Sequence, residues 1–126
     1  MSAAHKQADP LTTEEYLEGE RGSEIRHEFV LGRVYAMAGA SDEHNRITRN
    51  ILSELHTRLR GKRCEPFATD MKVRIRQTYS DVFYYPDVLV TCDPADNAKH
   101  YRERPTVIVE VLSPDTERTD RREKGR

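Results

Sequence analysis

Two carboxylates stand alone within apolar stretches, and they are the residues best placed to do chemistry. Residues 106–112 are β-branched or aliphatic apart from Glu110, and residues 84–91 carry one acid, Asp87. Both stretches favour strands, and residues 106–112 predict a buried strand in the centre of a sheet. A lone ionised acid in a buried strand is costly unless it is paired. Together the two acids predict a shared site that binds a hard cation through oxygen ligands. For either acid considered alone, the alternative is that it lies at the end of its strand, in water or beside an arginine.

The chemistry expected of such a site is phosphate-ester hydrolysis. Strands that are neighbours in the chain commonly pair, which would bring Asp87 and Glu110 together. A bound cation would relieve the repulsion between them, and a divalent ion can activate water and stabilise charge on a phosphate. A lysine could assist by orienting that water. The candidates are Lys124, on the helix expected after residue 113, and Lys72, on the preceding strand.

Three elements precede these strands. Residues 12–17 predict a short helix with a threonine cap, and residues 28–37 predict a hairpin that turns at Gly32 and opens with Glu28. Residues 41–60 predict the longest helix, with one apolar stripe. His44 lies on that striped face. A histidine there is more often a packed or capping residue, but it could project over one edge of the sheet.

Apolar and polar residues alternate along residues 67–76, which predicts a strand with one buried face and one solvent-exposed face. The wet face would be basic and could lie along a nucleic-acid backbone, although an ordinary charged edge is at least as good a reading. Arginines on the exposed side of helix 41–60 allow the same two interpretations, phosphate contacts or a solvated face. The candidate nucleic-acid contacts are Lys72, Arg74, Arg46 and Arg49.

Composition sets the wider limits. The chain has 126 residues, enough for one domain, and its net charge of −1 does not indicate a strongly basic nucleic-acid binder. Its two cysteines, Cys64 and Cys92, lack paired metal spacing, so we predict reduced thiols with neither a disulfide framework nor a zinc site. No apolar run is long enough to cross a bilayer, and a soluble cytoplasmic protein without a membrane partner is expected.

The motifs resemble those of a known nuclease group. Pro86-Asp87, then Glu110-Val111-Leu112, then Glu123-Lys124 resemble the PD-(D/E)xK nuclease superfamily. More closely, the chain is similar to the bacterial Uma-type restriction endonucleases. The matching pieces cover nearly the whole chain; they are residues 13–17, the Glu28 hairpin, residues 37–41 leading to 44–47, residues 84–88 and residues 109–114.

The resemblance implies a restriction-endonuclease-like fold with helices and strands (α/β). In detail it is an α+β arrangement with a mixed sheet. A central mixed sheet would be flanked by helices, with an N-terminal β-hairpin. It also implies that Asp87 and Glu110 bind magnesium or manganese and that the enzyme hydrolyses DNA. His44 would lie on the first core helix, and Glu28 would be an auxiliary ligand.

Two departures from the family pattern affect the site. The superfamily lysine would fall at position 112, which is leucine, so Lys124 from the next helix would take its place. The family also continues further, and we expect residues 1–126 to be a single domain that lacks the family's C-terminal segment. The alternative is an inactive remnant that acts as a nucleic-acid-binding or dimerisation module. A homodimer is possible, and metal-dependent hydrolysis of another phosphate ester is a third reading.

Overall fold

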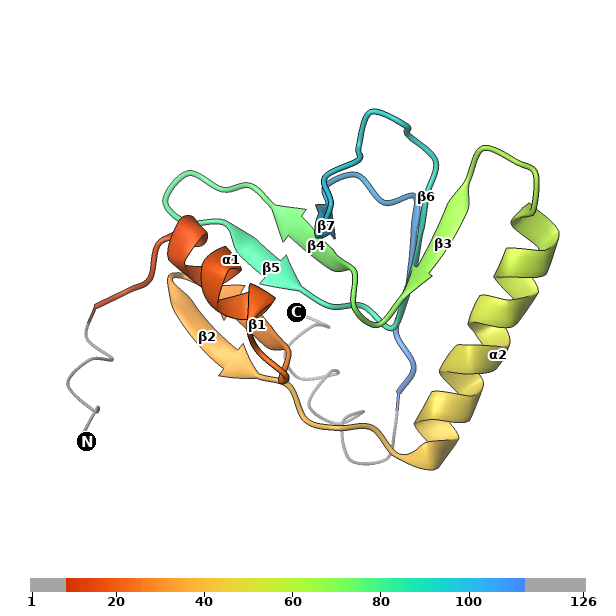
Figure 1. Cartoon of the computed structure of the whole chain (residues 1–126), viewed down its shortest axis with the longest axis horizontal. Helices are drawn as coiled ribbons and strands as arrows, with labels where there is room; N and C mark the ends of the chain where they lie inside the picture. Colours follow the sequence, from red (N-terminus) through yellow and green to blue (C-terminus); the bar gives the residue numbers. More distant parts are fainter. Residues whose placement is uncertain (1–8, 113–126) are drawn as a thin grey trace.

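The computed structural model describes residues 9–112, which form two helices and eight strands. Figure 1 shows them in chain order. They are α1 (Thr13–Arg21), β1 (His27–Val30), β2 (Arg33–Ala36), α2 (Asp42–Leu59), β3 (Glu65–Ala68), β4 (Lys72–Ile75), β5 (Val82–Tyr84), β6 (Val88–Thr91), β7 (Tyr101–Arg102) and β8 (Val107–Val109).

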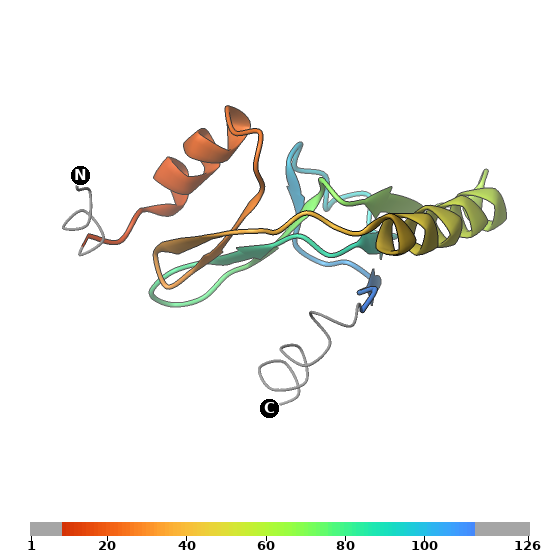
Figure 2. The same ribbon diagram turned by 90° about the horizontal axis from the view of Figure 1, so that it is seen from below.

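The strands form two hydrogen-bonded sheets. The first is five-stranded in the order β2-β1-β5-β4-β7 and is mixed, because β7 runs parallel to β4 while its other pairs are antiparallel. The second is antiparallel, in the order β3-β6-β8. Helix α1 lies over one face of the first sheet, and α2 packs along β3 and β6 (Figures 1 and 2). The predicted α+β class, with a mixed sheet and flanking helices, is confirmed.

Local sequence accounts for both helix starts. The Thr12 hydroxyl accepts a hydrogen bond from the Glu15 backbone N–H, and the Glu15 carboxylate accepts one from the Thr12 N–H. This reciprocal pair satisfies donors that an α-helix leaves free at its first turn. Ser41 caps α2 by accepting from the backbone N–H of His44. The helices predicted at residues 12–17 and 41–60 are therefore present, the first extending to Arg21.

The predicted hairpin is also present, as β1 and β2. Its two turn residues, Leu31 and Gly32, have φ of 52° and 77°. Two consecutive positive φ angles match the tight turns whose twist suits a hairpin. A Cβ at Gly32 would lie 2.4 Å from the Cβ of Pro10, so this position needs glycine for space as well as for conformation.

The best-packed core lies under α1. Tyr16, Phe29 and Phe83 are at most 2% exposed and contact one another. The Tyr16 ring centroid lies 4.7 Å from that of Phe29 and 5.0 Å from that of Phe83. The Tyr16 hydroxyl donates to the backbone carbonyl of His27 at 2.6 Å, which satisfies the polar end of a buried ring. This cluster fixes α1 on the first sheet.

The single strand predicted at residues 67–76 is instead two strands in different sheets. Ala68 pairs with Val88 and Val73 with Tyr84, so the chain advances five residues where its partner advances four. The extra residue is a β-bulge, and Thr69 has a φ of 44° there. A slip of one residue exchanges the faces of a strand, so the predicted alternation fails at this point.

The predicted wet basic face is consequently wrong for Lys72 and Arg74. Lys72 is 6% exposed, and the Arg74 guanidinium lies 5.5 Å from the ring centroid of Phe83 and 5.1 Å from that of Tyr101. Arg74 also pairs with Asp81 at 2.6 Å. Aromatic faces and an acid partner allow these cations to lie within the layer covered by α1.

The central strand predicted at residues 106–112 is also wrong in its position. The strand is shorter, Val107–Val109, and lies at an edge of the second sheet beside β6. Val107 is 45% exposed, whereas all four residues of β6 are buried. A run of β-branched residues suits an edge or a centre equally, and only the strand order distinguishes them.

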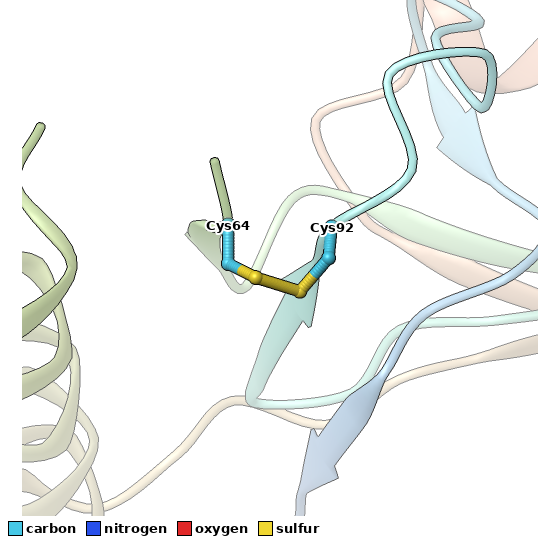
Figure 3. Close-up of a disulfide and its surroundings, with 2 residues drawn as sticks. All are labelled: Cys64 and Cys92. Carbon is cyan, nitrogen blue, oxygen red and sulfur yellow. A yellow bond between two sulfur atoms is a disulfide. The ribbon is translucent and has the colours of Figure 1, made fainter. Parts of the chain in front are cut away.

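The prediction of reduced thiols fails as well, since Cys64 and Cys92 form a disulfide (Figure 3). The two cysteines flank paired strands, because Glu65 pairs with Thr91 at the ends of β3 and β6. Their Cα atoms are 4.0 Å apart. Residues 28 positions apart in sequence gave no signal of this proximity, which arises from the register of the two strands. Neither helix in residues 9–112 is both long and apolar enough to cross a membrane.

Candidate metal and phosphate site

Asp87 lies where the chain passes from the first sheet to the second. Tyr85, Pro86 and Asp87 connect β5 to β6, next to the bulge in the partner strand. The Asp87 carbonyl accepts from the Thr69 N–H at 3.1 Å, and its carboxylate Oδ2 accepts from the Val111 N–H at 2.6 Å. Backbone bonds on both sides therefore fix this acid, including the orientation of its carboxylate.

His44 reaches the same carboxylate from α2. Its Nε2 lies 3.3 Å from Asp87 Oδ2, and the side chains are 16% and 19% exposed, respectively. The sequence left two readings of His44 open, a packed or capping residue and one that projects over an edge of the sheet; the structure shows it in contact with the acid just before β6, the middle strand of the second sheet. Its Nδ1 is buried and has no hydrogen-bond partner among residues 9–112. A buried ring nitrogen without a partner is unusual and marks a position held for something other than packing.

Glu110 stands across from Asp87 in the strand register. Val88 pairs with Val109, and one step further the same antiparallel register sets Asp87 opposite Glu110. Directly opposed residues share a face of a sheet, with Cβ atoms about 5 Å apart. The predicted pairing of the two acid-bearing strands is correct. Glu110 is exposed rather than buried, because β8 is an edge strand that ends at Val109.

The donor set suits magnesium or manganese in kind. Mg²⁺ is usually held by one or two carboxylates, with waters and substrate phosphates completing the shell. Asp87, just before β6, and Glu110, just after β8, supply two carboxylates at adjacent ends of paired strands. Within residues 9–112, no group of three or more His, Cys, Asp or Glu side chains is arranged to hold a metal.

The other residues predicted for the site are distributed unevenly. Glu28 is half-buried on β1, opposite Tyr35 in the hairpin register. Lys124 lies outside the described residues. Arg46 and Arg49 are on the exposed face of α2, as predicted, and Arg46 forms an ion pair with Asp42 at 3.4 Å. The described structure thus brings together Asp87, His44 and the position of Glu110.

Comparison with known proteins identifies the family. The Uma2 family, described as "Putative restriction endonuclease", matches residues 13–126. The chain belongs to this family. The expected resemblance is therefore confirmed.

Two curated proteins from Synechocystis match this Uma2-family chain. "Uncharacterized protein slr1290" is 39% identical over 98% of this chain and 66% of its own length. "Uncharacterized protein sll1609" is 34% identical over 90% of this chain and 65% of its own length. The chain thus spans about two thirds of the length of the curated relatives it matches.

A solved structure shows the fold. A crystal structure from Anabaena variabilis, described as "a putative nuclease belonging to DUF820", matches with a TM-score of 0.68. It covers 91% of this chain and 65% of the other, at 19% identity. At this identity the match shows the fold alone, and it is the family description that names a "putative restriction endonuclease".

Sequence reasoning missed a second polar cluster, on the α1 side of this Uma2-family chain. Glu20 accepts hydrogen bonds from the Tyr85 hydroxyl at 2.5 Å and from the His27 backbone N–H at 3.0 Å. Its other oxygen lies 2.8 Å from His27 Nδ1. Burial raises the pKa of Glu20, but these hydrogen bonds outweigh it and lower the pKa overall. Burial, with the bond to Glu20, raises the pKa of Tyr85.

No residue spacing in the sequence predicts this cluster. Glu20 and Tyr85 are 65 residues apart, on α1 and on the connection between the two sheets. The one available signal was an acid in the last turns of a short helix that otherwise has few buried residues. Glu20 holds α1 to the sheet, so its evident role is structural.

Proposed function

We propose that this chain is a metal-dependent nuclease that hydrolyses DNA phosphodiester bonds, with Asp87 and Glu110 holding a Mg²⁺ or Mn²⁺ ion. The observation that carries the proposal is Asp87 itself, fixed by the Val111 N–H and facing His44, across from Glu110 in the register. Membership of the Uma2 family supports it. A divalent ion at this position would supply an activated water and stabilise charge on the phosphate.

The chain's own groups have distinct roles in this proposal. The Val111 N–H holds one oxygen of Asp87, which leaves its other oxygen available to a ligand. His44 acts as a positioning residue through its contact with the same carboxylate. Such outer partners commonly contribute about 10–100-fold to metal affinity or activity. Lys124 is proposed to stabilise the phosphate charge, and Glu28 to act as an auxiliary ligand.

DNA would approach across the exposed face of α2 in this proposal. Arg46 and Arg49 are exposed on that helix, and its first turn carries His44. Lys72 and Arg74 are buried and are no longer included among the nucleic-acid contacts. The cytoplasmic location expected from the sequence stays part of the proposal.

The test is a calorimetric titration of Mg²⁺ and of Mn²⁺ into the parent chain and into Asp87→Asn and Glu110→Gln variants. A plasmid-nicking assay in the same buffers measures activity. Both variants keep the shape of the side chain and remove one charge. We expect metal binding to be lost and nicking to fall on the order of 10²–10³-fold, as when a charge-stabilising group is removed from an active site.

Glu65→Gln is the matched control, because Glu65 is an exposed acid on β3 and is not part of the proposed site. It should bind metal and nick DNA like the parent. Normal nicking by Asp87→Asn would sink the proposal. His44→Ala should lose about 10–100-fold in nicking while retaining the fold, and Lys124→Met tests whether that lysine completes the site.

A second candidate function is favoured by the exposure of β8. This strand is at the edge of its sheet, and Val107 and Leu112 are 45% and 48% exposed. An exposed apolar edge strand is a template for pairing with another chain, which would suit a dimerisation module. Light scattering over a range of concentrations tests it. A Val107→Lys variant should remain monomeric if β8 mediates pairing, and a parent chain that is monomeric at every concentration excludes it.

A further inference from the structure

A cavity lies between α1 and the first sheet, separate from the Asp87 site. Its volume is about 620 Å³, and Asp87, Glu110 and His44 do not line it. Its walls come from the end of α1, the segment that leads into β1, β4 and the segment before β7. This size is within the range of small-molecule sites, about 300–1,000 Å³. The wall residues used below are Glu20, Arg26, Lys72, Tyr85 and Lys99.

Lys72 is the unusual member of this wall. It is 6% exposed, and within residues 9–112 its ammonium has neither a hydrogen bond nor an ion pair. Its Nζ lies 5.3 Å from the ring centroid of Tyr85. Burial lowers the pKa of Lys72, while the charges of Glu20 and Asp70 act in the opposite direction. The ammonium itself is accessible from the cavity, since it is not among the buried polar atoms that lack a partner in residues 9–112, so an anion in the cavity can pair with it.

The nearest acid in the wall is already engaged. Both oxygens of Glu20 are used, one by the Tyr85 hydroxyl and the His27 N–H, the other by the His27 ring. Glu20 therefore contributes charge at a distance and holds the Tyr85 ring in place. Of the other acids in the wall, Glu24 and Asp70, Asp70 acts on Lys72 through its charge but is not bonded to it, which leaves a place for an anionic ligand.

A second cation converges on the same ring. The guanidinium of Arg26 lies 5.7 Å from the Tyr85 centroid, and one of its nitrogens donates to the Thr69 carbonyl at 2.9 Å. Arginine carries five N–H donors, so others remain for a ligand. Lys99, from the segment before β7, adds an exposed cation at the wall. Two cations near a common ring and a third in the same wall give the cavity groups that can bind an anion.

We infer that this cavity binds a small phosphate monoester, whose phosphate lies between Lys72 and Arg26 beside Tyr85. Arginine and lysine together are the common protein partners of phosphate, the first by its planar fork and the second as a point charge. The volume exceeds what inorganic phosphate fills, so the ligand carries an organic group. Such an ester arises either as a nucleotide released from nucleic acid or as a free sugar phosphate.

The experiment is a calorimetric titration of the full chain with four probes. They are deoxyadenosine 5′-monophosphate, ribose 5-phosphate, inorganic phosphate and uncharged deoxyadenosine. We expect both esters to bind, with deoxyadenosine at least about tenfold weaker, since it carries no charge with which to form charge-assisted hydrogen bonds. Tighter binding of the nucleotide than of ribose 5-phosphate assigns the ligand to nucleic-acid breakdown, and the reverse order assigns it to sugar phosphates.

Three variants separate the charge from the packing. Lys72→Met keeps the length of a buried side chain and should weaken ester binding at least about tenfold, whereas Lys72→Arg should retain most of it. Lys99→Ala changes an exposed position, so it keeps the fold, and it should weaken binding a few-fold. Lys62→Met is the control, an exposed lysine outside the cavity. Thermal melts confirm that each variant is folded.

Several outcomes would overturn the inference. They are no binding of either ester at millimolar concentration, equal binding of deoxyadenosine, or unchanged ester binding by folded Lys72→Met and Lys99→Ala. Asp87→Asn should leave ester binding intact, so that the cavity and the proposed nuclease site are tested independently. Lost ester binding in Asp87→Asn would place the phosphate at Asp87 and reject the cavity.

Discussion

The two sheets differ in how completely their polar and apolar groups are satisfied. Under α1, Tyr16, Phe29 and Phe83 are at most 2% exposed, and Glu20 is fully engaged. Beside α2, three buried polar atoms lack partners among residues 9–112. They are His44 Nδ1, Thr48 Oγ1 and Thr91 Oγ1, whereas the first sheet has one such atom, Arg102 Nε on β7.

The aromatic cluster under α1 is closely packed, and Tyr16, Phe29 and Phe83 do not line the cavity beside Lys72. Beside α2, unsatisfied buried groups and an exposed edge strand are typical of sites that complete themselves by binding. We therefore expect the first sheet to supply most of the folding free energy. The second sheet, tied by the Cys64–Cys92 disulfide, positions Asp87 and Glu110.

Truncating Phe83 in the first core should have the largest effect on stability. Phe83 is 0% exposed and contacts Tyr16, Phe29 and Tyr101. Phe83→Ala should lower the free energy of unfolding by about 3–5 kcal/mol, since it removes apolar contact and leaves a cavity. Urea denaturation measures this. Tyr79→Ala is the control at a 96% exposed ring and should change stability by less than about 0.5 kcal/mol. Equal effects would contradict the division between the sheets.

Loss of the disulfide should weaken the second sheet selectively. The bond closes a loop of 28 residues, for which chain entropy gives about 3–4 kcal/mol. Cys64→Ser with Cys92→Ser should lower stability by up to that amount. Hydrogen exchange should accelerate in β3 and β6 more than in β1 and β5. Uniform acceleration across both sheets would show that they unfold as one unit.

The loss of folding stability at acid pH should depend on Glu20. Its pKa is lower in the folded chain than the unfolded value of about 4.3, so its contribution is complete above that pH. The contribution is lost as the pH falls through the folded-state pKa. Glu20→Gln should therefore be less stable than the parent at neutral pH, with the gap closing below about pH 4. Thermal melts from pH 3 to 7 measure it, with exposed Glu14→Gln as control. A gap that is independent of pH would assign the effect to packing.

The smallest effect on stability is expected at the exposed face of α2. Arg49 is exposed and contacts Asn50 at 3.4 Å, so Arg49→Ala should change the free energy of unfolding by less than about 0.5 kcal/mol. If DNA crosses this face, the same variant should reduce the salt dependence of DNA binding by about one counterion. Fluorescence anisotropy at several salt concentrations measures it. Arg58, at the far end of α2 and paired with Glu54, provides the control.

The sequence by itself determined the two helix starts, the hairpin and the two isolated acids. Thr12 and Ser41 marked the helix starts, Gly32 marked the hairpin, and the isolated acids Asp87 and Glu110 marked two strands that do pair. These features are local, since caps, turns and periodicity depend on residues a few positions apart.

The tertiary structure alone decided which faces and edges these elements present. The bulge at Thr69 shifted the register by one residue, so that Lys72 lies in a buried wall rather than on a wet face. The strand order placed β8 at an edge and left Glu110 exposed, and the β3–β6 register brought Cys64 to Cys92. Register and strand order depend on pairings between distant residues, which local patterns do not encode.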